Sequence, residues 1–134
     1  MEGFRVVAPV QVRFSDLDLL GHVNNAVYLT YTEISRLVYF QSLALELADV
    51  SGVVARVEID YKKPVLLGQQ VEVGCRVKAF GRTSFRMQYR IEADGELAAL
   101  SETVQVWLEA GRPAPLPAAF REAVHRLELT PVEE

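Results

Sequence analysis

The second half of the chain consists of strand-like segments joined by short turns. From Val71 to Phe80 apolar and polar residues alternate strictly, and the alternation resumes at Phe85. The Asp94-Gly95 pair between two later segments is typical of a hairpin turn. Because consecutive strands with such short connections pair as hairpins, the pattern predicts an antiparallel sheet.

One long helix is predicted ahead of these strands, from Asn24 or Asn25 to about Leu47. Apolar residues in it recur with the four-three-four spacing of a helix face, at Val27, Tyr31, Ile34 and Val38. The remaining predicted elements are strands at Phe4–Phe14, Val53–Tyr61 and Leu97–Leu108 and a short helix at Ala118–Leu127. The expected fold class is therefore α+β, with about five antiparallel strands wrapped around one long central helix.

Length and charge limit the possible functions. The 134 residues fit a single domain spanning 1–134, and a net charge of −4 argues against nucleic-acid binding. Between Arg56 and Arg90, however, the chain has eight basic residues and three acidic ones, and this local excess of positive charge predicts an anionic partner. A lone cysteine, Cys75, cannot form an internal disulfide, and no apolar run approaches the roughly 20 residues of a membrane span. We expect a cytoplasmic protein that does not bind membranes.

A polar turn precedes the predicted helix. Two carboxylates, Asp16 and Asp18, lie here with His22 and two asparagines. Free backbone N–H groups and the helix dipole favour negative charge at a helix N-terminus. The turn is therefore the strongest candidate for chemistry.

The Asp16-x-Asp18 pair has three other interpretations. A calcium loop of the EF-hand type needs an oxygen ligand at its fifth position and a Glu at its twelfth, where this chain has Leu20 and Val27. An aspartyl phosphatase needs a parallel, doubly wound sheet, which the hairpins argue against. The structural alternative is that both aspartates only stabilise turns.

The string DLDLLGHVNNAVY, residues 16–28, resembles the signature of the 4-hydroxybenzoyl-CoA thioesterase-like branch of the hot-dog superfamily. Further matches follow in the same order: Asp60-Tyr61-x-x-Pro64 with Gly68, the Gly81–Phe85 turn, the Gly95 hairpin, the 104–106 strand and the Gly111–Pro117 exit. The resemblance covers nearly the whole chain. It implies a hot-dog fold whose sheet pairs with a second subunit, in a homodimer or in a homotetramer of two dimers.

The resemblance also implies site residues. The catalytic carboxylate of the family falls on Asp18, as nucleophile or general base, and the carbonyl-polarising backbone N–H falls on Asn25. A thioester is already activated, so these two groups need neither a metal nor a cofactor, coenzyme A being part of substrate and product. The substrate-binding positions in the turn are Gly21, His22, Val23 and Asn24.

Two further candidates lie outside the turn. Glu33 is eight residues after Asn25, where another hot-dog branch has a catalytic Glu, although an ion pair with Arg36 explains it equally well. The turn Arg82, Thr83 and Ser84 offers groups for the phosphates of coenzyme A, and a solvated basic surface is the alternative.

The function implied is hydrolysis of acyl-CoA to a carboxylic acid and coenzyme A. The Asn24-Asn25 pair favours the subgroup that acts on fatty or general acyl-CoA over the aryl-acyl enzymes. Two alternatives remain: a non-hydrolytic protein that binds acyl thioesters, in which Asp18 is a turn cap, and, less favoured, a hot-dog dehydratase.

Overall fold

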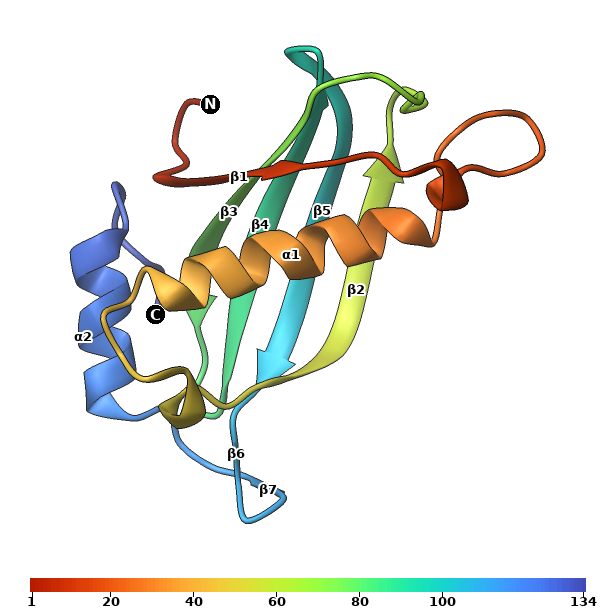
Figure 1. The fold of residues 1–134 in the computed structure, drawn as a ribbon. Helices are drawn as coiled ribbons and strands as arrows, with labels where there is room; N and C mark the ends of the chain where they lie inside the picture. The colour runs from red at the N-terminus through yellow and green to blue at the C-terminus, as the bar shows by residue number, and fades with distance from the viewer.

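The computed structural model describes residues 1–134 and confirms the α+β class. Five antiparallel strands form one sheet: β1 (Val6–Val10), β2 (Val53–Tyr61), β3 (Val71–Phe80), β4 (Ser84–Ala93) and β5 (Glu96–Val106). Their spatial order is β1-β3-β4-β5-β2, so β2 lies at one edge and β1 at the other. The long helix α1 (Val27–Gln41) crosses one face of this sheet (Figure 1). This is the arrangement of a hot-dog fold.

The predicted alternation sets which side chains enter the core. On β3 the buried residues Val73, Cys75 and Val77 face α1, and on β4 Met87 and Ile91 do the same. Polar side chains on both strands point to the opposite, outer face of the sheet. The bounds of β2, β3 and the C-terminal helix match the prediction.

Three predicted bounds are wrong. The helix ends at Gln41 and not near Leu47, because Ala44 adopts a positive φ of 60° that breaks helical geometry. The first strand covers Val6–Val10 within the predicted Phe4–Phe14, and a 3₁₀ turn begins at Phe14. The last long strand ends at Val106, and two short strands, β6 (Leu108–Glu109) and β7 (Arg112–Pro113), follow it.

The helix does not fill the whole width of the sheet. It packs mainly over β1 and β3, so β2 has no covering element. Every residue of β2 except Ile59 is exposed, including Val53, Val57 and Tyr61. The expectation that the sheet wraps the helix and buries most of it is therefore met on one side only.

The C-terminal segment closes one end of the molecule. Helix α2 (Ala118–Leu127) buries Phe120 against Phe85 and Trp107. Beyond α2, the C-terminal tail runs beside the part of β3 that β1 does not cover. There the Phe80 N–H donates to the Glu133 carbonyl (2.7 Å). A second short 3₁₀ turn covers Leu47–Asp49. No helix is long and apolar enough to cross a membrane.

Candidate active site

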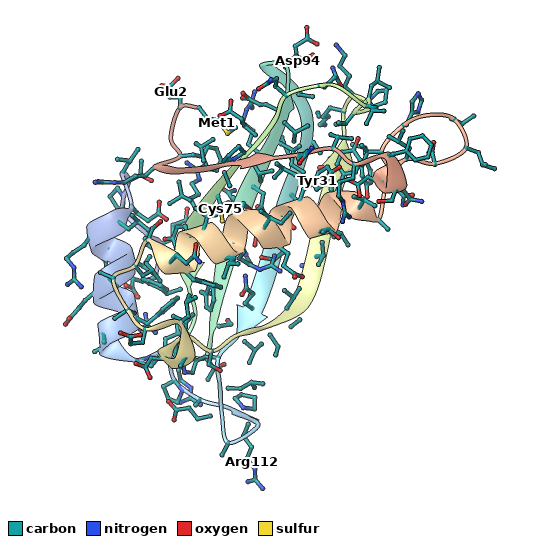
Figure 2. The ribbon with its side chains drawn as sticks, viewed as in Figure 1. Met1, Glu2, Tyr31, Cys75, Asp94 and Arg112 are labelled. Atoms are coloured by element: carbon teal, nitrogen blue, oxygen red, sulfur yellow. The ribbon has the colours of Figure 1, made fainter.

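The two aspartates of the polar turn have different environments. Asp16 is buried and accepts hydrogen bonds from the Arg13 side chain (2.8 Å) and the Tyr31 hydroxyl (2.7 Å). Burial alone would raise the pKa of Asp16, but the hydrogen bonds from Arg13 and Tyr31 outweigh it and hold the pKa below its usual range. Tyr31 lies on α1 near the turn (Figure 2), so Asp16 anchors the turn to the helix.

Asp18 is exposed and has one carboxylate oxygen free. Its Oδ1 accepts the backbone N–H groups of Leu20 (2.9 Å) and His22 (3.1 Å), which closes the turn. Gly21 has a positive φ of 78° here, a conformation that L residues rarely adopt. The second oxygen, Oδ2, has no partner in the chain. Asp18 thus combines a turn-forming oxygen with one available to a ligand.

The start of α1 offers an unpaired backbone donor. Helix α1 begins at Val27, later than the predicted Asn24 or Asn25, and its N-cap, Ala26, has no side-chain cap. In the turn before the helix, Asn24 Oδ1 accepts the Ala26 N–H (2.9 Å) and the Asn24 carbonyl accepts the Val27 N–H (2.9 Å). The Asn24 N–H in turn donates to the Asp16 carbonyl (2.8 Å). The Asn25 N–H, in contrast, donates to nothing within the chain. It lies at the end of α1 where the helix dipole is positive.

One cavity of about 350 Å³ joins these groups. Its lining residues come from the turn, from the start of α1 and from the end of β2 with the loop after it: Asp18, His22, Val23, Asn25, Tyr28, Tyr61, Lys62, Lys63 and Pro64. The carboxylate and the free amide predicted to act together therefore do lie on one cavity. The turn that carries Asp18 projects beyond the end of the sheet (Figure 1).

Five lining residues were not predicted as site residues: Tyr28, Tyr61, Lys62, Lys63 and Pro64. The Tyr28 hydroxyl accepts the Val65 N–H (3.2 Å), and burial raises the pKa of Tyr28, which keeps its own O–H proton available. Lys63 pairs with Glu96 across the loop. The Asp60-Tyr61-x-x-Pro64 motif marked this segment in the sequence, but nothing local indicated that it faces the start of α1.

The basic turn formed by Arg82, Thr83 and Ser84 lies far from Asp18 within one subunit. Ser84 on β4 pairs with Val106 on β5, and Val106 pairs in turn with Val53 at the start of β2. Tyr61, which lines the cavity, is at the other end of β2. Eight residues of strand separate these two ends, about 27 Å at ~3.4 Å per residue. Arg82 and Thr83 are held at this far end by backbone hydrogen bonds with Leu116 and Trp107.

Glu33 also lies outside the cavity. Its side chain is 77% exposed on α1, and its Oε2 is 3.9 Å from Arg36 Nη2. From Asn25 it is eight residues along the chain, about 12 Å at ~1.5 Å per residue. The chain contains no group of three or more His, Cys, Asp or Glu side chains arranged to hold a metal ion.

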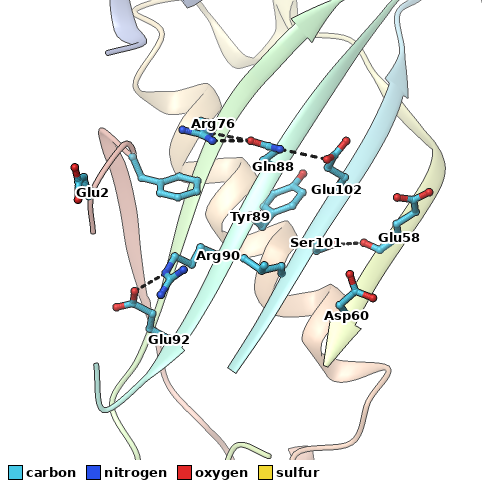
Figure 3. A pocket seen from close by; sticks show the side chains of 12 residues that line it. Glu2, Glu58, Asp60, Arg76, Gln88, Tyr89, Arg90, Glu92, Ser101 and Glu102 are labelled. Carbon is cyan, nitrogen blue, oxygen red and sulfur yellow. Dashed lines mark hydrogen bonds and ion pairs between the residues drawn. The ribbon is translucent and has the colours of Figure 1, made fainter. Parts of the chain in front are cut away.

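A larger cavity of about 670 Å³ lies on the outer face of the sheet (Figure 3). Both arginines in it are engaged: Arg76 donates to Gln88 (2.8 Å), and Arg90 donates to Glu92 (2.7 Å). The cavity has no helix N-terminus at its lining residues. The smaller cavity at the start of α1 is therefore the better candidate for thioester chemistry.

Comparison with known proteins agrees with this geometry. The sequence profile of the thioesterase-like superfamily matches residues 12–124. The chain is 31% identical to the Bacillus subtilis protein YsmA, over 77% of this chain and 74% of that protein. It is 28% identical to the 1,4-dihydroxy-2-naphthoyl-CoA hydrolase of Synechococcus elongatus, over 83% and 88% of the two chains.

A solved structure is also very similar. A thioesterase from Thermus thermophilus, in complex with coenzyme A and Zn, superposes with a TM-score of 0.94. It is 53% identical in sequence, and the match covers 98% of this chain and 100% of that one.

Proposed function

Because the chain belongs to the thioesterase-like superfamily, we propose that it is an acyl-CoA thioesterase in which Asp18 and Asn25 act on the thioester. Thioester hydrolysis follows from the family and from the relatives and structural neighbour described above. One observation supports the residue assignment above all others. Asp18, which has an unpaired carboxylate oxygen, and Asn25, which has an unpaired N–H, line the same cavity.

Asp18 has two routes to the product. As a nucleophile, its Oδ2 attacks the thioester carbonyl carbon, the C–S bond breaks to release coenzyme A, and water then hydrolyses the mixed anhydride. As a general base, it takes a proton from a water molecule that attacks the carbonyl directly. Both routes give a carboxylic acid and a free thiol.

Asn25 stabilises the charge that develops on the carbonyl oxygen. Its N–H is fixed by the turn and points from the positive end of α1, so it needs no reorganisation as the charge forms. A single donor of this kind typically contributes about 3 to 4 kcal/mol to transition-state stabilisation. The Tyr28 O–H, on the same cavity, is a second possible donor.

The other residues of the turn hold this pair in place. Gly21 permits the sharp turn, and the Val23 N–H ties the turn to the Val65 carbonyl (2.8 Å). His22 lines the cavity, where it can orient substrate or water. Asn24 holds the turn around Asn25, since its Oδ1 accepts the Ala26 N–H.

The bound coenzyme A needs cations for its phosphates. Lys62 and Lys63 lie at the cavity itself. The turn Arg82, Thr83 and Ser84 can contribute only from a second subunit, because it lies at the opposite end of the sheet.

A homodimer, alone or within a homotetramer, meets this requirement. The edge strand β2 is exposed along its length and can pair antiparallel with the same strand of a second copy. A two-fold axis at the middle of β2 brings the Val53 end of one subunit next to the Tyr61 end of the other. Arg82 of the partner subunit then lies on the same side as the cavity.

The test is hydrolysis of a panel of straight-chain and aromatic acyl-CoAs, followed as released thiol. Asp18→Asn is informative because Asn keeps an oxygen that can accept the Leu20 and His22 N–H groups, so the turn is preserved. We expect a loss of at least about 10³-fold in kcat/KM, with Asp49→Asn, exposed near the far end of α1, as a matched control. Full activity of Asp18→Asn on the best substrate contradicts the residue assignment, and no turnover by the wild type contradicts the function.

A further inference from the structure

The basic turn between β3 and β4 has its backbone carbonyls occupied from within the chain. The Arg82 carbonyl accepts the Leu116 N–H (3.0 Å), and the Thr83 carbonyl accepts the Trp107 N–H (2.8 Å). Both donors come from the segment that leads from β5 to α2. The N–H of Gly81, where the turn begins, closes it by donating to the carbonyl three residues later (2.7 Å).

The backbone donors at the centre of this turn are free. The N–H groups of Arg82 and Thr83 donate to nothing in the chain. The Arg82 side chain is exposed and takes part in no ion pair within the chain. A turn with occupied acceptors and free donors presents the positive ends of its dipoles, which suits an anion with several oxygens such as a phosphate.

The carbonyl of Gly81 is held by a side chain from a different element. Arg121 on α2 donates to it from Nη2 over 2.8 Å, across 40 positions of the chain. The Arg121 guanidinium also lies over the Phe80 ring, with Cζ 5.0 Å from the ring centroid. Its Nη1 pairs with Glu134 Oε2 at 3.1 Å. Arg121 therefore ties the end of β3 and the start of the turn to the C-terminal tail.

The tail fixes the carboxylate that pairs with Arg121. The Phe80 N–H donates to the Glu133 carbonyl (2.7 Å), and the Glu133 N–H donates to the Lys78 carbonyl (2.9 Å). Figure 1 shows the end of the chain beside α2. Because residue 133 is bonded to β3 on both sides, the neighbouring Glu134 is held next to Arg121. Helix, tail and turn thus form one connected hydrogen-bond network.

We propose that Arg121 is a positioning residue for the binding of coenzyme A. By holding the Gly81 carbonyl, it fixes the turn in the conformation that leaves the Arg82 and Thr83 N–H groups free for a phosphate. This inference rests on the proposed function, in which the basic turn binds phosphates of coenzyme A. Arg121 does not touch the ligand, and Glu134 keeps it in place.

Arg121→Met tests this role, because Met keeps an apolar side chain over Phe80 and removes both donors. We expect the Kd for coenzyme A, measured by calorimetry, to rise about fivefold, the usual effect of one lost hydrogen bond. The KM for acyl-CoA should rise by the same factor with kcat unchanged. The Kd for pantetheine, which lacks the phosphates, should not change. Arg126→Met, exposed on the same helix, is the matched control and should bind coenzyme A like the wild type.

A double variant distinguishes positioning from direct contact with the phosphate. If Arg121 acts through the turn, much of its effect disappears once the Arg82 contact is lost. Adding Arg121→Met to Arg82→Ala should then raise the Kd for coenzyme A by less than about twofold. The same factor in both backgrounds shows an independent contact of Arg121 with the ligand and overturns the positioning role.

Glu134→Gln tests the same network without altering α2. It removes the charge that pairs with Arg121, so we expect the Kd for coenzyme A to rise about twofold, with no further rise when it is combined with Arg121→Met. Thermal unfolding shows whether each variant is folded, and Glu134→Gln decides the matter if Arg121→Met is not.

The outcomes separate this proposal from the hydrolase function. A wild-type Kd for coenzyme A in folded Arg121→Met, or an equal rise in the Kd for pantetheine, overturns the positioning role. A wild type that does not bind coenzyme A overturns the phosphate-binding turn and its positioning together. A wild type that binds coenzyme A but releases no thiol from any acyl-CoA contradicts the hydrolase function only, and the Kd values still decide the role of Arg121.

Discussion

The hydroxyl of Tyr61 donates a hydrogen bond to the carbonyl oxygen of Asn25 over 2.8 Å. These residues are 36 positions apart in the chain, one at the end of β2 and the other at the start of α1. The Tyr61 ring also packs edge-on against Tyr28, with ring centroids 5.0 Å apart. The edge strand thereby orients the residue whose N–H is proposed to bind the oxyanion.

Tyr61→Phe removes this hydrogen bond and keeps the ring that packs on Tyr28. Because the Asn25 backbone is then less well fixed, we expect kcat for the best acyl-CoA to fall about tenfold with little change in KM, as for a group that acts in the transition state. Steady-state kinetics of thiol release provide the measurement. An unchanged kcat would show that the Tyr61 hydroxyl does not position the donor.

Arg82→Ala tests the role of the basic turn. If Arg82 of the partner subunit binds a coenzyme A phosphate, KM for acyl-CoA should rise about tenfold, as befits loss of one charge-assisted contact. KM for a short thioester without the nucleotide should not change. Arg112→Ala, at the exposed tip of the β6–β7 hairpin (Figure 2), is the control. Equal effects on both substrates would remove the phosphate-binding role.

Tyr31→Phe tests the anchor between the polar turn and α1. Loss of a hydrogen bond to a charged, buried acceptor should lower the free energy of unfolding by about 1.5 to 3 kcal/mol at pH 7. The folded-state pKa of Asp16 is depressed, so its contribution is present above its unfolded pKa and is lost as pH falls through the folded value. Urea unfolding between pH 7 and pH 2 should therefore show a smaller acid-dependent loss for Tyr31→Phe than for the wild type.

Glu128 should show the opposite dependence on pH. Burial raises its pKa, although hydrogen bonds from the Tyr39 hydroxyl (2.5 Å) and the Val77 N–H (2.9 Å) to one oxygen act against this. Its stabilising contribution is complete below the unfolded pKa and is lost as pH rises through the folded one. We expect Glu128→Gln, which keeps an acceptor for both donors, to abolish a slope of at most about 1.4 kcal/mol per pH unit just above pH 4.5. The same slope in wild type and variant would exclude Glu128 as its source.

Local sequence patterns were enough to predict the bounds of some elements but not of others. The strands Val53–Tyr61 and Val71–Phe80 were predicted to the residue because turn-forming residues such as Gly52, Pro64 and Gly81 flank them. Helix α1 was predicted too long because Leu43, Leu45 and Leu47 continue an apolar pattern past its end. The positive φ of Ala44 that ends it has no signal in a residue of high helix propensity.

The candidate site was only partly accessible from sequence. Asp16 and Asp18 are the same residue type two positions apart, and only the folded chain distinguishes the buried anchor from the exposed carboxylate. Tyr61 and Lys62 reach the start of α1 because strand β2 crosses the whole sheet, a relation that no local pattern encodes. The distance between Arg82 and Asp18 depends likewise on sheet register, which is why the proposed site takes Arg82 from a second subunit.

The pairing of the C-terminal tail with β3 has a consequence for how the protein associates. A sheet whose two edge strands are both unprotected can pair with further chains at each edge without limit and form fibres. Here the tail covers the part of β3 that β1 leaves unpaired, and β1, which forms the rest of this edge, is only five residues long and contains Pro9, which has no N–H to offer a neighbour. This leaves β2 as the edge open to another chain, so in the proposed dimer growth stops at two subunits per sheet. The tail thus makes self-association finite, and a truncation before Glu128 would remove that limit.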